Sequence, residues 1–263
     1  HIGHIIIMIL IQIGGIGGMT FTSFFALSFM GKSSFTSKMM LKDMLNEDRT
    51  GGVFRVILNN LFVTLFIEGI GAYFIYIDVR GSLPGGTQQE LFYAMFHAVS
   101  AFCNAGISTL SGNMYDPLVA DKYNLHFWIA MLIIFGGLGF PIVFNYLKLL
   151  HHLLMNGIKI LIGKQKHYIH TPRIINVHTY IVVISTLILL ITGTAFYLFF
   201  EYDNTLGDLP LRGKLANAFL GAVTPRTAGF NVADMATLGP PTFMLTLILM
   251  GIGAAPMSTR GGF

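Results

Sequence analysis

Long runs of apolar residues alternate with polar loops along this chain. Each run approaches the ~20 apolar residues that a helix needs to cross a bilayer. The pattern therefore predicts an all-α polytopic membrane protein. We expect the spanning helices over residues 5–30, 53–77, 127–147 and 177–200, and over a last run that starts at Phe243.

The composition agrees with a location among membrane lipids. Apolar residues make up 54% of the chain and charged residues 11%, and the mean hydropathy is +0.68. These values are too apolar for an ordinary soluble domain. The net charge of +4 comes from residues in the loops rather than along one face, so it does not predict nucleic-acid binding.

Candidate chemistry is sparse. The single cysteine, Cys103, excludes an internal disulfide framework and a multi-cysteine metal site. We interpret it as a small apolar residue at a helix end. No Ser-His-Asp or paired-carboxylate arrangement stands out, so the sequence favours neither an enzyme nor an organic cofactor.

Basic residues mark two loops as cytoplasmic. Residues 31–52 and 148–175 are rich in Lys and Arg, whereas the loops on the other side hold most of the acidic residues. The positive-inside rule then makes the spans run inward, outward, inward, outward and inward in chain order. This topology predicts a multi-pass protein of the cell membrane, meaning a plasma or inner membrane. Because the chain starts at His1 with a helix under way and stops in a glycine-rich stretch, we expect an internal piece of a longer protein.

The chain repeats itself after roughly 123 residues. The shared landmarks are Gly14-Gly15-Ile16-Gly17 with Gly136-Gly137-Leu138-Gly139, Glu68-Gly69 with Thr192-Gly193, and Gly106 with Gly229. The unit is an outgoing span, a short helix with a glycine turn, and an incoming span. Residues 1–52 then hold the inward helix of a first repeat and a cytoplasmic linker, 53–175 a second repeat, and 176–263 a third. Equivalent spans run the same way, which argues against an inverted-repeat transporter.

Two apolar segments, residues 88–103 and 215–223, are too short to cross a bilayer. Each lies on the outer side, so it must enter the membrane and return, and its non-helical part must be buried in protein or line a cavity. Small residues and a glycine follow each one, and glycine lets consecutive carbonyls turn towards one axis. A ring of carbonyls replaces the hydration shell of a monovalent cation, and the partly negative end of the short helix faces that ion. We therefore expect an ion selectivity filter that includes Asn104, Ala105, Gly106, Thr227, Ala228 and Gly229.

At these residues the sequence resembles the Trk/Ktr/HKT superfamily of potassium transporters. HAVSAFCNAGIS (97–108) and AVTPRTAGFN (222–231) resemble its second and third filter segments. IQIGGIGGMTF (11–21) and FGGLGFPIVFNY (135–146) resemble its inward helices, and GAAPMSTRGGF (253–263) resembles its gating loop. The resemblance implies four membrane–pore-loop–membrane repeats around one central pore, of which about two and a half are present here. It also implies potassium as substrate, one glycine per filter turn, a homodimer, and cytosolic nucleotide-binding regulatory subunits.

The resemblance assigns an intramembrane gate to residues Gly253, Ser258, Thr259, Arg260, Gly261 and Gly262. The loop of the family usually reads Gly-Ser-Thr-Gly-Gly-Gly, whereas this chain has Met257-Ser258-Thr259-Arg260-Gly261-Gly262, and the departure that matters is Arg260. Arginine is bulky and permanently charged. It either strengthens the barrier to cations or points sideways to a carboxylate.

Two further residues are candidates for supporting the filter. Glu68 lies roughly 15 Å deep in its span at the helical rise per residue, where ionisable side chains are rare and face the bundle interior. It either braces the filter backbone or packs as a protonated or hydrogen-bonded residue. Arg226 stands directly before the third filter turn, and we interpret it as a brace at the filter rim.

Two alternatives to potassium uptake stay open. A relative of the same fold transports sodium, or both sodium and potassium. A non-conducting membrane enzyme or assembly factor would use the re-entrant turns only as structure. The last alternative predicts that replacing Gly229 leaves ion flux untouched.

Overall fold

The computed structural model describes residues 2–29, 53–139, 177–226 and 228–253, together with scattered positions between 142 and 156. All regular elements within these residues are helices, as the sequence predicts. They are α1 (Ile2–Phe29), α3 (Val53–Val79), α4 (Gly86–Phe102), η1 (Asn113–Tyr115), α5 (Tyr123–Leu138), α7 (Val177–Glu201), α8 (Leu211–Val223), η2 (Met235–Thr237) and α9 (Pro240–Ile252).

Two of the described helices are long and apolar enough to cross a membrane, over Asn60–Val79 in α3 and Thr179–Glu201 in α7. The helices predicted over 5–30, 53–77 and 177–200 are confirmed, with ends that move by no more than a few residues. Shorter apolar stretches are Ile2–Gly15, Tyr123–Leu138 and Pro240–Ile252.

Helix α5 differs from the continuous helix predicted over 127–147. It ends at Leu138 because Gly139 has φ 85° and ψ 153°, which lies outside the helical region. Helical geometry returns at Ile142 and Val143, and the Val143 N–H donates to the Gly139 carbonyl at 3.2 Å. The apolar pattern runs across the glycine, so the prediction continues the helix, although Pro141 two residues later is a signal for a helix break.

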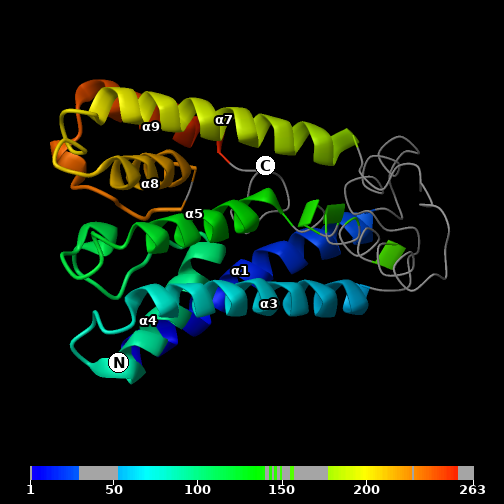
Figure 1. Cartoon of the computed structure of the whole chain (residues 1–263). Coiled ribbons are helices and arrows are strands. Elements are labelled where there is room, and N and C mark those ends of the chain that lie inside the picture. The colour runs from blue at the N-terminus through cyan, green and yellow to red at the C-terminus, as the bar shows by residue number, and fades with distance from the viewer. Residues whose placement is uncertain are drawn as a thin grey trace.

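The long helices α3 and α7 lie on opposite sides of the described part and run in the same direction (Figure 1). Helix α5 lies between them and runs the opposite way. The short helix α4 packs on α3 and α5, and the short helix α8 packs on α7 and α5. Helix α9 packs on α7, and α1 contacts α3 and α4. The two short helices therefore share α5 as a common neighbour.

Large apolar side chains cover the outward faces of the two long helices. Phe62 of α3 is 71% exposed, and Ile191 and Phe199 of α7 are 68% and 77% exposed. The buried core lies between the helices and includes Ile75, Tyr93, Ile129, Leu220 and Phe230. Extended apolar surfaces are rare on soluble proteins, and lipid tails accept such side chains as readily as a protein core does.

Both segments predicted as short helices are helical. Helix α4 begins two residues before the predicted start at 88, and α8 begins four residues before 215, directly after Pro210. The N-terminal part of each, within its first five residues, is hydrogen-bonded to the loop after the preceding long helix. The Gly81 N–H donates to the Glu90 carboxylate at 2.6 Å, and the Lys214 ammonium donates to the Tyr202 carbonyl at 2.9 Å. Side chains of opposite charge thus do the same positioning work for α4 and α8.

Candidate functional site

The turn after α4 is a Schellman motif. Asn104 has a left-handed backbone with φ 55°. The Ala105 N–H donates to the Ser100 carbonyl at 2.8 Å, and the Asn104 N–H donates to the Ala101 carbonyl at 3.1 Å. These are the two hydrogen bonds of that motif, and asparagine is one of the few residues that tolerates its left-handed position. The motif stops the helix at Phe102 and sends the chain into Ala105 and Gly106.

The turn after α8 reaches a similar geometry by another route. The Ala228 N–H donates to the Thr224 carbonyl at 2.9 Å, and Gly229 has φ 84°. Gly106 has φ 68°, so both predicted filter glycines use backbone angles that other residues adopt at a cost. Thr227 lies outside the described residues.

The two turns lie against each other. A Cβ atom built on Gly106 would clash with the Ala228 carbonyl oxygen and lie 2.6 Å from the Gly229 Cα. A Cβ atom on Gly229 would lie 3.3 Å from the Gly106 Cα and 3.9 Å from the Ala105 carbonyl oxygen. The carbonyls of Ala105 and Ala228 thus border one backbone contact that leaves no room for side chains. The structure brings the described members of both predicted turns together.

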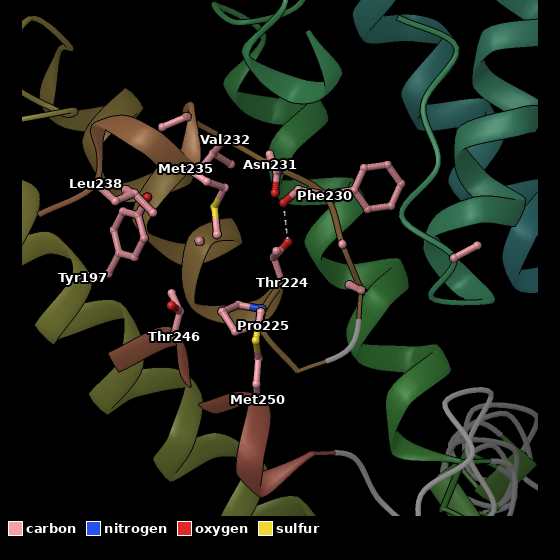
Figure 2. Close-up of a pocket in the computed structure, with 15 residues that line it drawn as sticks. Tyr197, Thr224, Pro225, Phe230, Asn231, Val232, Met235, Leu238, Thr246 and Met250 are labelled. Carbon is pink, nitrogen blue, oxygen red and sulfur yellow. Dashed lines mark hydrogen bonds between the residues drawn. The ribbon is translucent and has the colours of Figure 1, made fainter. Parts of the chain in front are cut away.

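A hydroxyl near the end of each short helix holds the residue that follows the glycine. The Ser100 hydroxyl donates to the Ile107 carbonyl at 2.8 Å, and the Ile107 N–H lies 3.0 Å from the same oxygen. The Thr224 hydroxyl donates to the Phe230 carbonyl at 2.7 Å (Figure 2). Sequence reasoning missed both hydroxyls. The available signal was their shared place, five or six residues before the glycine and about 123 residues apart.

His97 adds a second anchor to the turn after α4. Its Nδ1 lies 2.8 Å from the Tyr93 carbonyl and its Nε2 lies 2.9 Å from the Ser108 hydroxyl. Because a carbonyl can only accept, Nδ1 carries a proton, and a neutral ring then accepts the Ser108 proton at Nε2. The ring is fully buried and stacks on Tyr93 at 3.8 Å between centroids. Nothing in the sequence pattern singled out this histidine.

Glu68 lies at the junction of α1, α3 and the end of α4. Its carboxylate accepts a hydrogen bond from the Gln12 amide at 3.0 Å and a weak one from the Cys103 thiol at 3.8 Å. Gly15 makes room for this thiol, since a Cβ there would lie 2.5 Å from the sulfur. Cys103 is buried at a helix end, as the sequence predicts, but its sulfur contacts a carboxylate rather than only apolar groups. The structure brings Glu68 to the residue that immediately precedes the turn.

Arg226 connects the turn after α8 to the far end of α9. Its side chain is 8% exposed, and Nε donates to the Gly253 carbonyl at 3.2 Å. Gly253 is the residue at which α9 ends, with φ 67° and ψ −147°. The remaining residues of the predicted gate, Ser258, Thr259, Arg260, Gly261 and Gly262, lie outside the described residues.

A pocket of about 380 Å³ opens beside the two turns (Figure 2). Ala105, Ala228 and Gly229 lie in its wall together with Tyr197 of α7 and Met250 of α9. The wall is mostly apolar, and its polar residues include Thr224, Asn231 and Thr246. Within the described residues, no group of three or more His, Cys, Asp or Glu side chains lies close enough to hold a metal ion.

Comparison with known proteins places this geometry in context. The profile of a family described as TrkH, cation transport protein, matches residues 2–263. The Ktr system potassium uptake protein B of Vibrio alginolyticus is 34% identical over 266 residues, covering 99% of this chain and 53% of that protein. The protein of the same name from Bacillus subtilis is 33% identical over 262 residues, covering 99% and 54%. The potassium/sodium uptake protein NtpJ of Enterococcus hirae is 33% identical over 263 residues, covering 99% and 52%. The chain thus spans about half the length of these curated relatives.

Proposed function

Because the chain belongs to the TrkH family of cation transport proteins, we propose that it forms part of a membrane pore for potassium uptake with a filter of backbone carbonyls. The observation that carries this proposal is the contact between Gly106 and Gly229. Each glycine follows a helix too short to span a bilayer, and irregular backbone at membrane depth occurs only inside protein or along a water-filled cavity. Carbonyls at such a place replace the water around a monovalent cation.

The filter consists of residues 104–106 and 227–229, with the ends of α4 and α8 directed at the ion. The partly negative C-terminus of each helix favours a cation there. Ser100 and Thr224 support the proposal, because each takes up the carbonyl that follows the glycine and thereby fixes the course of the turn.

Two relatives are named potassium uptake proteins, and these names favour potassium as the substrate. The name of NtpJ includes sodium. This name is the specific observation that keeps sodium, or mixed sodium and potassium transport, as the second candidate.

The pore is built from membrane–pore-loop–membrane repeats, with residues 53–175 as one unit and 176–263 as the next. The order long helix, short helix, apolar helix in α3–α4–α5 and again in α7–α8–α9 supports this division. Residues 1–52 contribute the inward helix of a preceding unit and a linker, and the complete pore has four units.

The filter is supported by Glu68 and Arg226 and gated from Gly253 onwards. Glu68 joins three elements directly before the first turn, and Arg226 joins the second turn to the residue that starts the gate. Ser258, Thr259, Arg260, Gly261 and Gly262 form the rest of this gate.

The transporter works as a multi-pass protein of the plasma or inner membrane. Its surroundings are membrane lipid, a second copy of itself in a homodimer, and cytosolic nucleotide-binding regulatory subunits. The apolar outward faces of α3 and α7 support the lipid contact.

The test is rubidium tracer uptake into liposomes that hold the complete protein, with sodium as competitor. We expect wild-type uptake to resist sodium and Gly229→Ser to become sodium-sensitive. A side chain at a left-handed position strains the backbone by about 1–2 kcal/mol, and relief of this strain displaces the carbonyls that distinguish the two ions. We expect the difference between the ions to fall by ~1.4 kcal/mol, which corresponds to a roughly tenfold loss of discrimination.

Gly69→Ser is the matched control, because nothing lies within 4 Å of a Cβ at Gly69. Strong sodium inhibition of the wild type would favour the second candidate. Absent uptake by the wild type, or uptake that Gly229→Ser leaves unchanged, would contradict the filter and favour turns with a purely structural role.

A further inference from the structure

The residue three positions before each glycine differs between the two turns. Cys103 holds this place before Gly106 and Arg226 holds it before Gly229. The Cys103 thiol bonds sideways to Glu68 in the neighbouring long helix α3. Arg226 instead reaches the carbonyl of Gly253, where α9 ends. The repeat therefore does not require an arginine here, and the arginine makes a contact that its counterpart does not make.

The end of α9 is suited to an arginine donor. The Gly253 N–H still donates to the Leu249 carbonyl at 3.4 Å, so the glycine nitrogen belongs to the helix. Its ψ of −147° turns its own carbonyl away from the helical direction. The last carbonyls of a helix lack partners within the helix and carry partial negative charge. A guanidinium satisfies such a carbonyl by hydrogen bond and by charge.

Arg226 is also closely enclosed by other elements. A cavity of about 10 Å³ touches Arg226 and is bordered by Gly137 and Leu138 of α5 and by Leu190 of α7. Its surroundings are thus packed, and the side chain is 8% exposed. If a substitution removes the arginine, bulk water cannot easily replace it as the donor to the Gly253 carbonyl.

We propose that Arg226 is a positioning residue through which the carbonyl at Ala228 and the end of α9 hold each other in place. The inference rests on the proposed function, because it assigns Arg226 a part in ion selection by way of Gly229 and its neighbours. Gly229 lies three positions after Arg226 in the chain. Gly106 lies against Ala228 and Gly229, and the Thr224 hydroxyl holds the carbonyl of the next residue, Phe230. A shift at Gly253 therefore reaches the filter through Arg226, and a shift in the filter reaches α9 by the same bond.

The test is a double-mutant cycle in the complete protein with Arg226→Met, Gly253→Ala and both together. The first change removes the donor and the charge while keeping a side chain of similar length, and the second strains a backbone with φ 67° and displaces the acceptor. We expect each single variant to weaken discrimination between rubidium and sodium by roughly tenfold, the factor that ~1.4 kcal/mol produces. The double variant should be no worse than the poorer single one, since both remove the same bond. Arg226→Lys keeps a positive donor and should restore part of the discrimination.

Arg212→Met is the control for the loss of positive charge, because Arg212 is exposed and bonds Asn124 instead. Wild-type discrimination in Arg226→Met, or effects of the two single changes that simply add, would overturn the proposal. If Arg226→Met does not fold, Gly253→Ala alone decides it, because wild-type discrimination in that variant contradicts the coupling.

Thermal unfolding in detergent of the wild type, the two single variants and the double variant measures the strength of this contact independently of transport. If the proposed function is wrong but the contact is real, the wild type shows no rubidium uptake, and the changes in melting temperature of the variants are still non-additive. Additive melting changes show that the contact itself carries no coupling. The two failures are therefore distinguishable.

Discussion

Gly106 and Gly229 touch through their backbones, although 123 positions separate them in the chain, and a Cβ on Gly106 would lie 2.6 Å from the Gly229 Cα. Both have positive φ, 68° and 84°. Their contact unites two short helices that share α5 as a neighbour but belong to different parts of the sequence. Two glycines that face each other in this way bring two sets of carbonyls to one place.

The two glycines differ in how tightly they are enclosed, which gives the first prediction. We expect Gly106→Ala to impair rubidium uptake and discrimination against sodium more than Gly229→Ala does. A methyl group on Gly106 clashes with the Ala228 carbonyl, whereas one on Gly229 meets its nearest atom at 3.3 Å. Both variants carry the cost of about 1–2 kcal/mol for a side chain in the left-handed region. Tracer uptake by the two variants in liposomes measures the order, and equal effects would show that the contact with Ala228 does not matter.

The second prediction concerns the hydroxyl of Thr224. Thr224→Val keeps the shape of the side chain but leaves the buried Phe230 carbonyl without this donor. An unsatisfied buried acceptor costs about 1–3 kcal/mol, so we expect a lower melting temperature and weaker ion discrimination. Thr224→Ser keeps the hydroxyl and should stay close to wild type. A Thr224→Val protein that matches the serine variant in both measurements would contradict the anchoring role.

Much of the fold follows from the sequence, because a helix in lipid must be long and apolar. The starts of α1, α3 and α7 are predictable for this reason. The break at Gly139 does not follow from the apolar pattern, which continues across it, although Pro141 two residues later signals that a helix ends or kinks near this place. Glycine permits such angles without requiring them.

The site follows from the sequence only in part. The repeat spacing points to Gly106 and Gly229 as related residues, but their contact depends on how α4 and α8 pack against α5. The hydroxyls of Ser100 and Thr224 stand among apolar residues and have no pattern of their own. The sequence predicts the position of Arg226 beside the turn but not the direction of its side chain, because that direction depends on where α9 ends. Long-range contacts of single polar side chains are thus the part that spacing cannot supply.

The third prediction concerns Glu68 and its matched position in α7. We expect Glu68→Leu to reduce both stability and uptake, because the Gln12 amide and the Cys103 thiol lose their acceptor beside the turn after α4. Loss of a hydrogen-bond partner of this kind costs about 1–3 kcal/mol. Glu68→Gln keeps an acceptor oxygen and should keep most of the function. Melting temperature and rubidium uptake measure the two effects.

Thr192→Val is the control for this prediction, because Thr192 occupies the matching place in the repeat. Its exposed hydroxyl donates to the Ile188 and Leu189 carbonyls, both within its own helix. We expect no more than a few tenths of a kcal/mol from this surface change. A Glu68→Leu protein that behaves like Thr192→Val would show that Glu68 merely fills space.

The last prediction concerns Glu201, which joins the outer end of α7 to the start of α9. Its buried carboxylate accepts hydrogen bonds from the Gly239 N–H at 2.9 Å, from the Asn204 amide at 2.8 Å and from the hydroxyls of Thr205 and Thr242. Bonds to a charged group contribute about 1.5–3 kcal/mol each. We expect Glu201→Leu to lower the melting temperature more than any other substitution named here, because several donors lose one acceptor together. Asp203→Asn, two residues away and exposed, should leave it unchanged. If Glu201→Leu and Asp203→Asn have the same melting temperature, the carboxylate does not hold α9 in place. The apolar contacts between α9 and α7 must then position α9 instead.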